Sequence, residues 1–531
     1  MPERRRLPAL PGEVGWWLAV AAAILLAFFF RLGAWPLFDL DEGAFAQATR
    51  EMMASGNYLA TWLDGRPRYD KPIFSYWMQA LAVQLFGARE FAFRLPSALA
   101  ASIWVVAVFA FARGRLGTPG AAAAALLIAL AAGSMVIGRA ATADAWLNLW
   151  LALTFLEIAR WQEAPRRSIL LRAYLWMGLG FLTKGPVAVV IPLLASLAFF
   201  ASEGRWREWL RAAFDLRGWA VFLVVALPWY LLILAQEGAD FFYGFFVEHN
   251  LLRFLETREG HGGSVFYYLV VLPLVLSPFA GWMISALRRW RQRPRGLERL
   301  AWIWFGVVFV LFSLSSTQLP HYILYGVTPL LLVLAMHRDQ LRSQWLAFLP
   351  ALLLFALMLA MPWMLAFAAG QLDRAYEVEL AERGLAILDG RYLVSILAFT
   401  VAAFTIVWVR QLQIWHRLIA IAALQALALT TTFIPAVAAI QQGPVREAAE
   451  IARDLQADVV AYSINMPSFS VYRGMATERR MPVPGEVAVT RSHAVADIAA
   501  AYPDCELDIL YHEGGIVLLK VLREGGRCDG A

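Results

Sequence analysis

Charged residues are scarce in this chain. Only 16% of its 531 residues are Asp, Glu, Lys or Arg, whereas 60% are hydrophobic. A soluble globular protein does not need so much apolar surface, so the composition excludes that class and indicates a polytopic membrane protein. Cysteine is scarcer still: Cys505 and Cys528 both lie late in the sequence, where they either pair in an oxidising compartment or stay as two idle thiols.

The apolar residues gather into runs long enough to cross about 30 Å of hydrocarbon. We predict a polytopic α-helical protein with about thirteen transmembrane helices. The first is expected to be a retained anchor, because no small-residue cleavage site follows it. The expected spans are 14–32, 96–112, 120–137, 145–159, 170–182, 186–201, 218–235, 265–287, 300–316, 322–336, 345–368, 392–409 and 415–438.

Arginine clusters between the spans indicate the orientation. Three arginines, Arg4 to Arg6, precede the first span, and the densest cluster, Arg288 to Arg295, follows the eighth. With thirteen spans every cluster falls on one side, which the positive-inside rule assigns to the cytoplasm. The net charge of +6 is therefore largely an orientation signal, and nucleic acid is not an expected partner.

The composition divides the chain into two parts. Residues 1–440 are expected to form the transmembrane domain, with long external loops at about 33–95 and 236–264. Residues 441–531 are expected to form a small α/β domain in the periplasm, too small to be stable without its neighbours. Helical periodicity runs from Val445 to Gln456. Short strands are then expected to begin at Asp458, Phe469, Val487, Asp508 and Ile516.

The most unusual polar groups lie in the first external loop. Asp39, Asp41 and Glu42 stand within four residues beside an apolar span. Like charges so close together raise the pKa of at least one carboxyl group, which is common in acid-base sites. Asp70 and Lys71 stand before a proline, where the backbone is extended, and are candidates for a local ion pair. A membrane protein rarely places so many ionisable groups beside its spans unless they meet a polar ligand or one another.

Further candidates map to the same face of the membrane. Asp144 begins the fourth span, either as a helix cap or as a site residue. His249 and Arg253 are four residues apart, so on a helix they share a face and suit a phosphate or carboxylate ligand. Tyr322 lies at the outer end of the tenth span, next to His321. Together these residues predict one active site at the outer face.

Other polar groups have simpler explanations. Lys184 precedes a Gly-Pro turn and is expected to be structural, with its ammonium snorkelling to the surface. Arg66 and Arg68 are expected to be solvated or to face lipid head groups. A divalent metal (zinc, magnesium or manganese) is conceivable, because carboxylates and imidazoles are its usual ligands, although no recognised ligand spacing is present. Its candidate ligands are Asp70, Glu248, His249 and His261.

The order of these motifs resembles the bacterial aminoarabinose lipid A transferase family, which is related to the protein O-mannosyltransferases. The likeness rests on Asp41-Glu42-Gly-Ala-Phe-Ala, Glu51-Met-Met-Ala-Ser-Gly-Asn-Tyr, Asp-Gly65, Tyr69-Asp-Lys71-Pro, Thr142-Ala-Asp144, Thr183-Lys184-Gly-Pro, Glu248-His249-Asn-Leu-Leu-Arg253-Phe and Leu319-Pro-His-Tyr322. It covers the membrane part of the chain in register. The resemblance implies the C-type fold of polyprenyl-phosphate-dependent glycosyltransferases.

The resemblance also implies roles for individual residues. Asp41 matches the catalytic acid of the family, and Lys71 and Arg253 match residues that hold the lipid-linked phosphate. The position before Lys-Pro can be Glu in relatives and is Asp70 here, a shorter side chain that weakens a metal role. Asp39, Glu42, Asp144 and Tyr322 complete the predicted substrate-binding set, and Asp70 and His249 are the two metal candidates.

The implied function is inverting transfer of a sugar, first 4-amino-4-deoxy-L-arabinose, from undecaprenyl phosphate to lipid A at the periplasmic face of the bacterial inner membrane. Expected partners are the lipid-linked donor, lipid A or another envelope acceptor, and membrane lipids. The same fold could transfer a hexose or mannose to a protein or envelope glycan. An alternative of another class is a transporter or flippase for the lipid-linked sugar, but such proteins place ionisable groups near the bilayer centre and often contain repeats. Whether Asp41 acts as a base or stabilises charge stays open.

Overall fold

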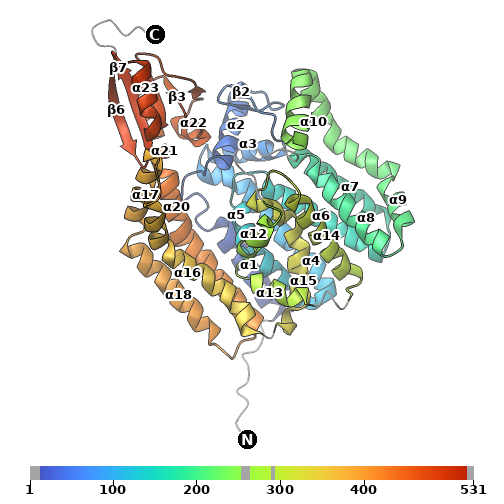
Figure 1. Cartoon of the computed structure of the whole chain (residues 1–531). Helices are drawn as coiled ribbons and strands as arrows, with labels where there is room; N and C mark the ends of the chain where they lie inside the picture. Colours follow the sequence, from blue (N-terminus) through green and yellow to red (C-terminus); the bar gives the residue numbers. More distant parts are fainter. Residues whose placement is uncertain (1–11, 253–263, 289–292, 342, 523–531) are drawn as a thin grey trace.

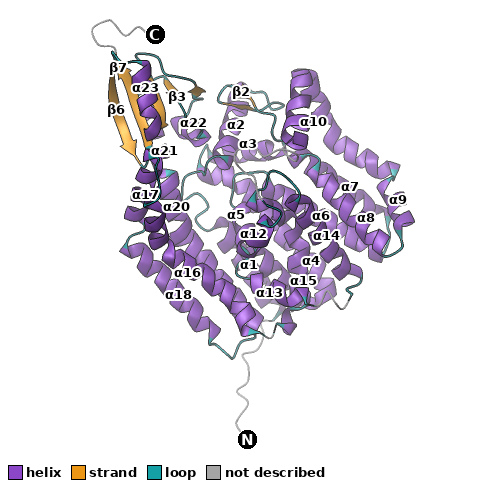
Figure 2. Cartoon of the chain, viewed as in Figure 1, coloured by secondary structure: helices purple, strands orange, loops and turns teal. Residues whose placement is uncertain are grey.

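The structure is a computed structural model of the chain, and it describes residues 12–252, 264–288, 293–341 and 343–522. A large helical part carries a small sheet at one end (Figure 1). Helices also form most of the segment between the first and second predicted spans (Figure 2). Apart from the sheet, the only strands in the described ranges are two short ones in this segment. The long predicted loop 33–95 is therefore an ordered cap of helices and a hairpin.

The helical part begins with elements that surround this cap. Their bounds are α1 (Glu13–Ile24), η1 (Leu25–Phe29), α2 (Asp41–Ser55), α3 (Phe74–Phe86), α4 (Glu90–Leu130), α5 (Ala132–Ile137), α6 (Asp144–Glu163), α7 (Arg167–Lys184), α8 (Val187–Ser202), α9 (Trp206–Ala213), α10 (Leu216–Phe242) and η2 (Tyr243–Leu252). A hairpin of β1 (Trp62–Leu63) and β2 (Arg66–Pro67) lies between α2 and α3.

The second half of the helical part completes the bundle. Its elements are α12 (Tyr267–Val275), α13 (Ala280–Leu287), α14 (Gly296–Ser313), η4 (Pro320–Gly326), α15 (Val327–Met336), η5 (Arg338–Gln340), α16 (Gln344–Ala369), α17 (Ala375–Ile387), α18 (Gly390–Val407), α19 (Ile414–Ala428), η6 (Leu429–Phe433) and α20 (Ile434–Gln441). Between α16 and α18, α17 reaches toward the sheet (Figure 1).

Every predicted span falls on helix, but the predicted number of thirteen is not confirmed. Within the described ranges, six helices are long and apolar enough to cross a membrane, or seven if the bent pair α12 and α13 forms one span. One reason for the difference is α4, a 41-residue helix that joins two predicted spans across a break at Gly117 (φ 67°). Others, such as α8 and Pro320–Met336, are apolar but short.

The core of the bundle forms around α4, which packs against α1, α3, α6 and α15. The alanines Ala121 to Ala125 are completely buried, because small residues let neighbouring helices approach closely. The buried indole of Trp104 donates to the hydroxyl of Thr328 at 2.9 Å, so its polar atom is satisfied. By contrast α16 and α18 leave most of their apolar surface exposed, as expected of helices that face lipid.

The end of the described chain forms a five-stranded sheet with three helices. The sheet order is β4-β3-β5-β7-β6, with β3 parallel to β4 and β5, and β7 antiparallel to β5 and β6. Its elements are α21 (Gly443–Asp454), β3 (Val459–Ala461), α22 (Pro467–Arg473), β4 (Glu478–Arg479), β5 (Val487–Arg491), η7 (Ser492–Ala494), α23 (Val495–Ala501), β6 (Glu506–Glu513) and β7 (Ile516–Leu522). These elements are called the C-terminal domain below.

The predicted helix from Val445 and four of the five predicted strands are confirmed. The strand predicted at Phe469 is wrong, because this segment is the helix α22. Pro467 stands at its first turn and Gly474 ends it with φ 90°, and these two helix signals outweigh the aromatic and β-branched residues between them. Both alternatives for the cysteines, a Cys505–Cys528 pair or two idle thiols, involve Cys528, which lies outside the described residues.

Candidate active site

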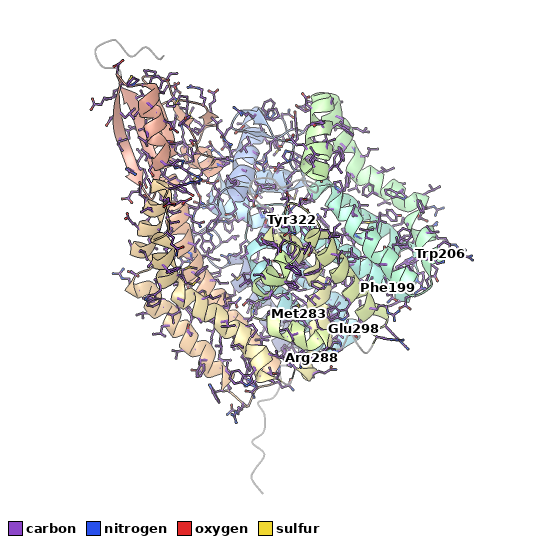
Figure 3. All side chains as sticks on the ribbon, in the orientation of Figure 1. Phe199, Trp206, Met283, Arg288, Glu298 and Tyr322 are labelled. Atoms are coloured by element: carbon purple, nitrogen blue, oxygen red, sulfur yellow. The ribbon has the colours of Figure 1, made fainter. Side chains whose placement is uncertain are left out.

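A polar cavity, called the main cavity below, lies where the ends of the bundle helices meet the cap and the C-terminal domain. Its volume is about 310 Å³. Six of the residues predicted from the sequence line it, although they come from five separate segments of the chain: Asp41, Asp70, Lys71, Asp144, His249 and Tyr322. Figure 3 shows Tyr322 in the middle of the molecule, below the cap. The structure thus brings most of the predicted site together in one place.

Asp41 enters this cavity from the first turn of α2. Carboxylates are stabilised there because the N-terminus of a helix carries partial positive charge. Consecutive residues on a helix point in different directions, so Asp41 is exposed to the cavity whereas Glu42 is buried beneath it. α2 ends at Gly56 in the left-handed conformation (φ 70°), a common helix stop.

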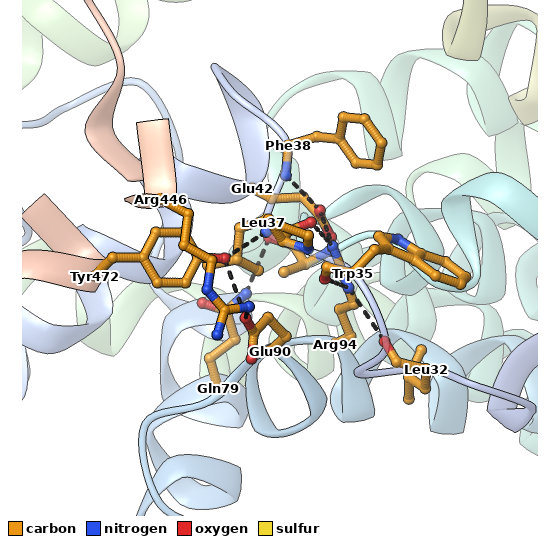
Figure 4. Close-up of polar contacts among 12 residues, drawn as sticks. Leu32, Trp35, Leu37, Phe38, Glu42, Gln79, Glu90, Arg94, Arg446 and Tyr472 are labelled. Atoms are coloured by element: carbon orange, nitrogen blue, oxygen red, sulfur yellow. Dashed lines mark hydrogen bonds and ion pairs between the residues drawn. The ribbon is translucent and has the colours of Figure 1, made fainter. Parts of the chain in front are cut away.

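Glu42 holds the structure together instead of contacting the main cavity. Its carboxylate makes a two-pronged ion pair with Arg94, with N–O distances of 2.8 and 2.6 Å (Figure 4). It also accepts hydrogen bonds from the backbone N–H groups of Phe38 (2.9 Å) and Ala141 (2.8 Å). Arg94, 1% exposed, donates to three carbonyl groups of the segment before α2. Glu42 thus has a structural role, and because it also lines the second cavity described below, its predicted substrate-binding role stays a prediction.

Asp144 is the centre of a buried polar network. Its Oδ1 lies 2.6 Å from Nζ of Lys184 and 2.7 Å from the hydroxyl of Tyr325. The N-terminus of α6 favours the carboxylate and the C-terminus of α7 favours the ammonium. Lys184 is only 11% exposed and lies 5.2 Å from the ring centre of Tyr322. The snorkelling interpretation of Lys184 is wrong, because its charge points into the cavity.

Asp70 lies between two cations in the same wall. Its carboxylate is 2.8 Å from Arg68 and 3.5 Å from Lys71. The predicted Asp70–Lys71 ion pair is therefore present, but Arg68 is the closer partner. Arg68 is 13% exposed and also donates to the hydroxyl of Tyr76 at 3.1 Å. The expectation that Arg68 is solvated is wrong, whereas Arg66 is exposed as expected.

Asp39 joins the site to the C-terminal domain. Its carboxylate accepts hydrogen bonds from the backbone N–H (3.0 Å) and the hydroxyl of Ser468, at the start of α22. Burial raises the pKa of Asp39 to about 7, against these hydrogen bonds, and the charges of Glu42 and Asp64 add to the increase. Crowded acids do raise one pKa here, as predicted, but burial is the main cause.

A second cavity of about 350 Å³ adjoins the first. Most of its exposed surface is apolar and comes from residues such as Trp35, Phe38 and Ile434, although Asp39, Glu42 and Arg94 also line it. The two cavities share a boundary formed by Asp41, Thr142, Asp144 and His321. Asp41 is thus accessible from two directions, an arrangement that suits a reaction between two separate substrates.

The residues suggested for a metal do not form a recognisable centre. Across the ranges that the structure describes, no group of three or more His, Cys, Asp or Glu side chains is placed to hold a metal ion. Asp70 lies between two cations, which disfavours a divalent ion beside it. His249 lines the main cavity, but His261 and the predicted phosphate-binding Arg253 lie outside the described residues.

Several site residues were missed by the sequence reasoning. Lys184 and His321 were present in recognised motifs but were given structural or minor roles; His321 Nε2 lies 3.6 Å from Asp144. Arg479, Asn465 and Pro467 of the C-terminal domain also line the cavity. No sequence signal places them there, because they reach the site only when the C-terminal domain packs on the cap.

Comparison with known sequences relates the chain to lipid-dependent glycosyltransferases. Residues 70–231 match the family described as dolichyl-phosphate-mannose-protein mannosyltransferase. The undecaprenyl phosphate-alpha-4-amino-4-deoxy-L-arabinose arabinosyl transferase of Edwardsiella ictaluri is 31% identical over 62% of this chain and 61% of its own length. The protein of the same name from Serratia proteamaculans is 31% identical over 63% and 60%. The chain thus spans about three fifths of the length of these curated relatives.

Comparison with solved structures extends over nearly the whole chain. The crystal structure of ArnT from Cupriavidus metallidurans bound to undecaprenyl phosphate superposes with a TM-score of 0.78 and 22% identity, covering 96% of this chain and 98% of the other. The same protein in the apo state gives 0.77, again at 22% identity. The predicted fold is therefore confirmed: this chain is a multi-pass helical membrane protein with the C-type glycosyltransferase fold and a small C-terminal sheet domain.

Proposed function

We propose that this chain, as a relative of the undecaprenyl phosphate-aminoarabinose arabinosyl transferases, transfers a sugar from undecaprenyl phosphate to lipid A. The sugar best supported is 4-amino-4-deoxy-L-arabinose, which the names of the relatives contain. The observation that carries the proposal is the polar cavity, in which Asp41, Lys71 and Asp144 meet at the ends of apolar helices. A lipid-linked donor can keep its tail in the membrane while its phosphate reaches this cavity.

The chemistry required is displacement at the anomeric carbon. The bond between C1 and the phosphate oxygen breaks, and its electron pair leaves with undecaprenyl phosphate. An acceptor oxygen forms the new bond at the opposite face of C1, so the configuration inverts. The leaving phosphate gains negative charge, and a fixed cation such as Lys71 stabilises that charge in the transition state.

The role of Asp41 depends on the acceptor atom. If the acceptor is a hydroxyl group, Asp41 takes its proton as the new bond forms. If the acceptor is a phosphate of lipid A, its oxygen is already anionic and no proton has to be removed. Asp41 then stabilises the positive charge that develops on the sugar ring. In both cases the carboxylate has to lie at the boundary of the two cavities, as it does.

The proposed location is the bacterial inner membrane, with the cavity and the C-terminal domain in the periplasm. Arg288 and Glu298 lie below Tyr322 in the view of Figure 3, away from the cap. Arg288 begins the densest arginine cluster of the sequence, which the positive-inside rule places in the cytoplasm. A protease added outside spheroplasts should cut the C-terminal domain, and protection of that domain would contradict this orientation.

The direct test is a transfer assay with the purified chain. Labelled undecaprenyl-phosphate-aminoarabinose and lipid A are incubated with the wild type and with Asp41→Asn. We expect transfer by the wild type and a loss of about 100-fold or more in the variant. Asp373→Asn is a matched control, because Asp373 is an exposed carboxylate between α16 and α17 that lines neither cavity. Equal rates for wild type and Asp41→Asn would remove the catalytic role of Asp41.

The same assay separates the alternatives. The match of residues 70–231 to mannosyltransferases supports testing hexose donors and protein or glycan acceptors alongside. Transfer only from such donors would replace aminoarabinose in the proposal. A flippase would move the donor across proteoliposomes without forming any glycosylated product. Movement of the donor without product, from every donor tested, would overturn the enzymatic proposal.

A further inference from the structure

The C-terminal domain forms one wall of the main cavity. Its contacts with the cap are specific: Arg50 of α2 donates to the carbonyl oxygens of Ser470, Val471 and Gly474 at 2.7 to 2.9 Å. α22 lies directly beside α2 (Figure 1). The hydroxyl of Tyr472 accepts from the backbone N–H of Leu37 at 2.7 Å. These contacts hold the residues that follow α22, among them Arg479, against the cavity.

Asp64 connects Arg479 to the cap. It stands in the turn of the β1–β2 hairpin, and Glu51 accepts from the backbone N–H groups of Asp64 (2.8 Å) and Gly65 (3.2 Å). The side chain of Asp64 then accepts from the hydroxyl of Ser470 (2.6 Å) and the backbone N–H of Thr477 (3.3 Å). Arg479 is its third partner, at 3.5 Å. Asp64 therefore positions Arg479 but does not depend on it.

Arg479 differs from Arg68 and Lys184, which also line the cavity. Arg68 and Lys184 form short ion pairs of 2.8 and 2.6 Å with buried aspartates. The ion pair of Arg479 is longer, and its side chain is 32% exposed. A guanidinium group has five N–H donors in a planar fork that matches two oxygens of a phosphate. Arg479 thus retains donors for an anionic ligand inside the cavity.

Inverting displacement needs two separate phosphate sites when both substrates carry a phosphate. The leaving phosphate and the incoming oxygen lie on opposite faces of C1, so one group of cations cannot hold both. Lys71 and Lys184 lie on the wall built by the cap and the helix ends, whereas Arg479 lies on the wall built by the C-terminal domain. The donor phosphate belongs with the wall of the lysines, which also carries Arg66 and Arg68, whereas Arg479 is the arginine that the C-terminal domain contributes to the opposite wall, on the side of the acceptor.

We propose that Arg479 binds a phosphate group of the acceptor, so that the C-terminal domain selects phosphorylated glycolipids. This inference rests on the proposed function for the identity of the two substrates. It makes Arg479 a specificity-determining residue of the C-terminal domain. It also makes the active site a composite of both domains, which neither domain completes alone.

The matched control is the next residue in the sequence. Arg480 directly follows β4 and forms ion pairs with Glu478 (3.0 Å) and Glu486 (2.6 Å). It does not line the main cavity. Arg479→Ala and Arg480→Ala therefore remove the same charge, one residue apart, with only the first in the proposed site. Asp64 keeps two hydrogen bonds in Arg479→Ala, so the C-terminal domain should remain docked.

The test measures equilibrium binding to the full-length protein in detergent, without donor and without turnover. The probes are lipid A with its phosphates and the same lipid A after phosphatase treatment. Arg479→Ala should bind the phosphorylated form about 10- to 100-fold more weakly than the wild type, and Arg479→Lys should fall between them. Arg480→Ala should match the wild type. Binding of undecaprenyl phosphate should be unchanged in all three variants, which also shows that they are folded.

Two results would overturn the inference. One is equal binding of phosphorylated lipid A by the wild type and Arg479→Ala. The other is an equal loss of affinity for undecaprenyl phosphate, which would assign Arg479 to the donor. Failure of the proposed function has a different signature, because the wild type would then bind neither lipid A form and transfer no sugar to either. The binding assay and the transfer assay therefore distinguish the two failures.

Discussion

The ion pair between Glu42 and Arg94 provides a sharp test of what the first-loop acids do. Both side chains are buried, at 4% and 1% exposure. Each carboxylate oxygen of Glu42 accepts two hydrogen bonds, one from Arg94 and one from a backbone N–H. In Glu42→Gln the amide NH₂ has to replace one of these oxygens. Whichever way the amide is turned, its N–H groups then face two donors, and the charge of Arg94 loses its partner.

The cost of this substitution follows from the broken contacts. A hydrogen bond to a charged group contributes about 1.5–3 kcal/mol and a neutral one about 1 kcal/mol. Breaking a buried ion pair by removing one partner costs about 3–5 kcal/mol. This range agrees with the sum of the two hydrogen-bond contributions. We therefore expect Glu42→Gln to lower the free energy of unfolding by about 3–5 kcal/mol. Equilibrium unfolding in mixed micelles measures this loss of free energy. A melting experiment should show a fall of several degrees in melting temperature.

The chain offers a matched control for Glu42→Gln and a clear refuting result. Glu13 forms an exposed ion pair with Arg113 at 3.1 Å, so Glu13→Gln should leave stability unchanged. The double variant Glu42→Gln with Arg94→Met should lose less than the sum of the two single changes, because no unpaired charge remains buried. If Glu42 bound substrate instead, Glu42→Gln would raise KM without lowering stability. That outcome would refute the structural role.

Three further predictions concern the site and the C-terminal domain that packs on it. Lys184→Met should destabilise the protein by about 3–5 kcal/mol, because it leaves the buried carboxylate of Asp144 without its cation. Adding Asp144→Asn should recover part of this loss in a double-mutant cycle. Additive losses would argue against the ion pair. Arg50→Ala removes three hydrogen bonds to the C-terminal domain, so limited proteolysis should release that domain faster, and an unchanged digestion pattern would count against this contact. The pKa of Asp39 is raised from 3.8 to about 7, so its contribution to stability is fully present below pH 3.8 and is lost as the pH rises through about 7. Asp39→Asn should remove this pH dependence, and parallel melting curves for variant and wild type across that range would contradict it.

Much of the architecture could be read from local patterns. Each predicted span lies on helix because a long apolar run can satisfy its backbone in lipid only by hydrogen bonding to itself. The predicted number of spans is not confirmed, since α4 carries two predicted spans in one helix with a break at Gly117, and helices such as α8 are apolar but short. In the C-terminal domain, alternation predicts β5 and β7 correctly, whereas the segment at Phe469 is the helix α22, which Pro467 begins and Gly474 ends.

In the candidate site, too, local patterns predict some features and not others. Asp41, Lys71 and Asp144 were identifiable because ionisable residues beside apolar spans are rare and here stand in recognisable motifs. The partners of such residues could not be identified in the same way. Glu42 faces Arg94, 52 positions away, and no local pattern distinguishes a buried carboxylate from one that meets a ligand.

The sequence by itself determined that this protein is helical, spans a membrane and gathers its polar groups at one face, because composition and periodicity act through neighbouring residues. Only the tertiary structure decided which charges pair and which face the cavity. It turned Lys184 into the partner of Asp144, made Glu42 structural and brought Arg479 to the site from the C-terminal domain. The physical reason is that pairing and burial depend on contacts between segments up to several hundred residues apart, whose energies no local pattern contains.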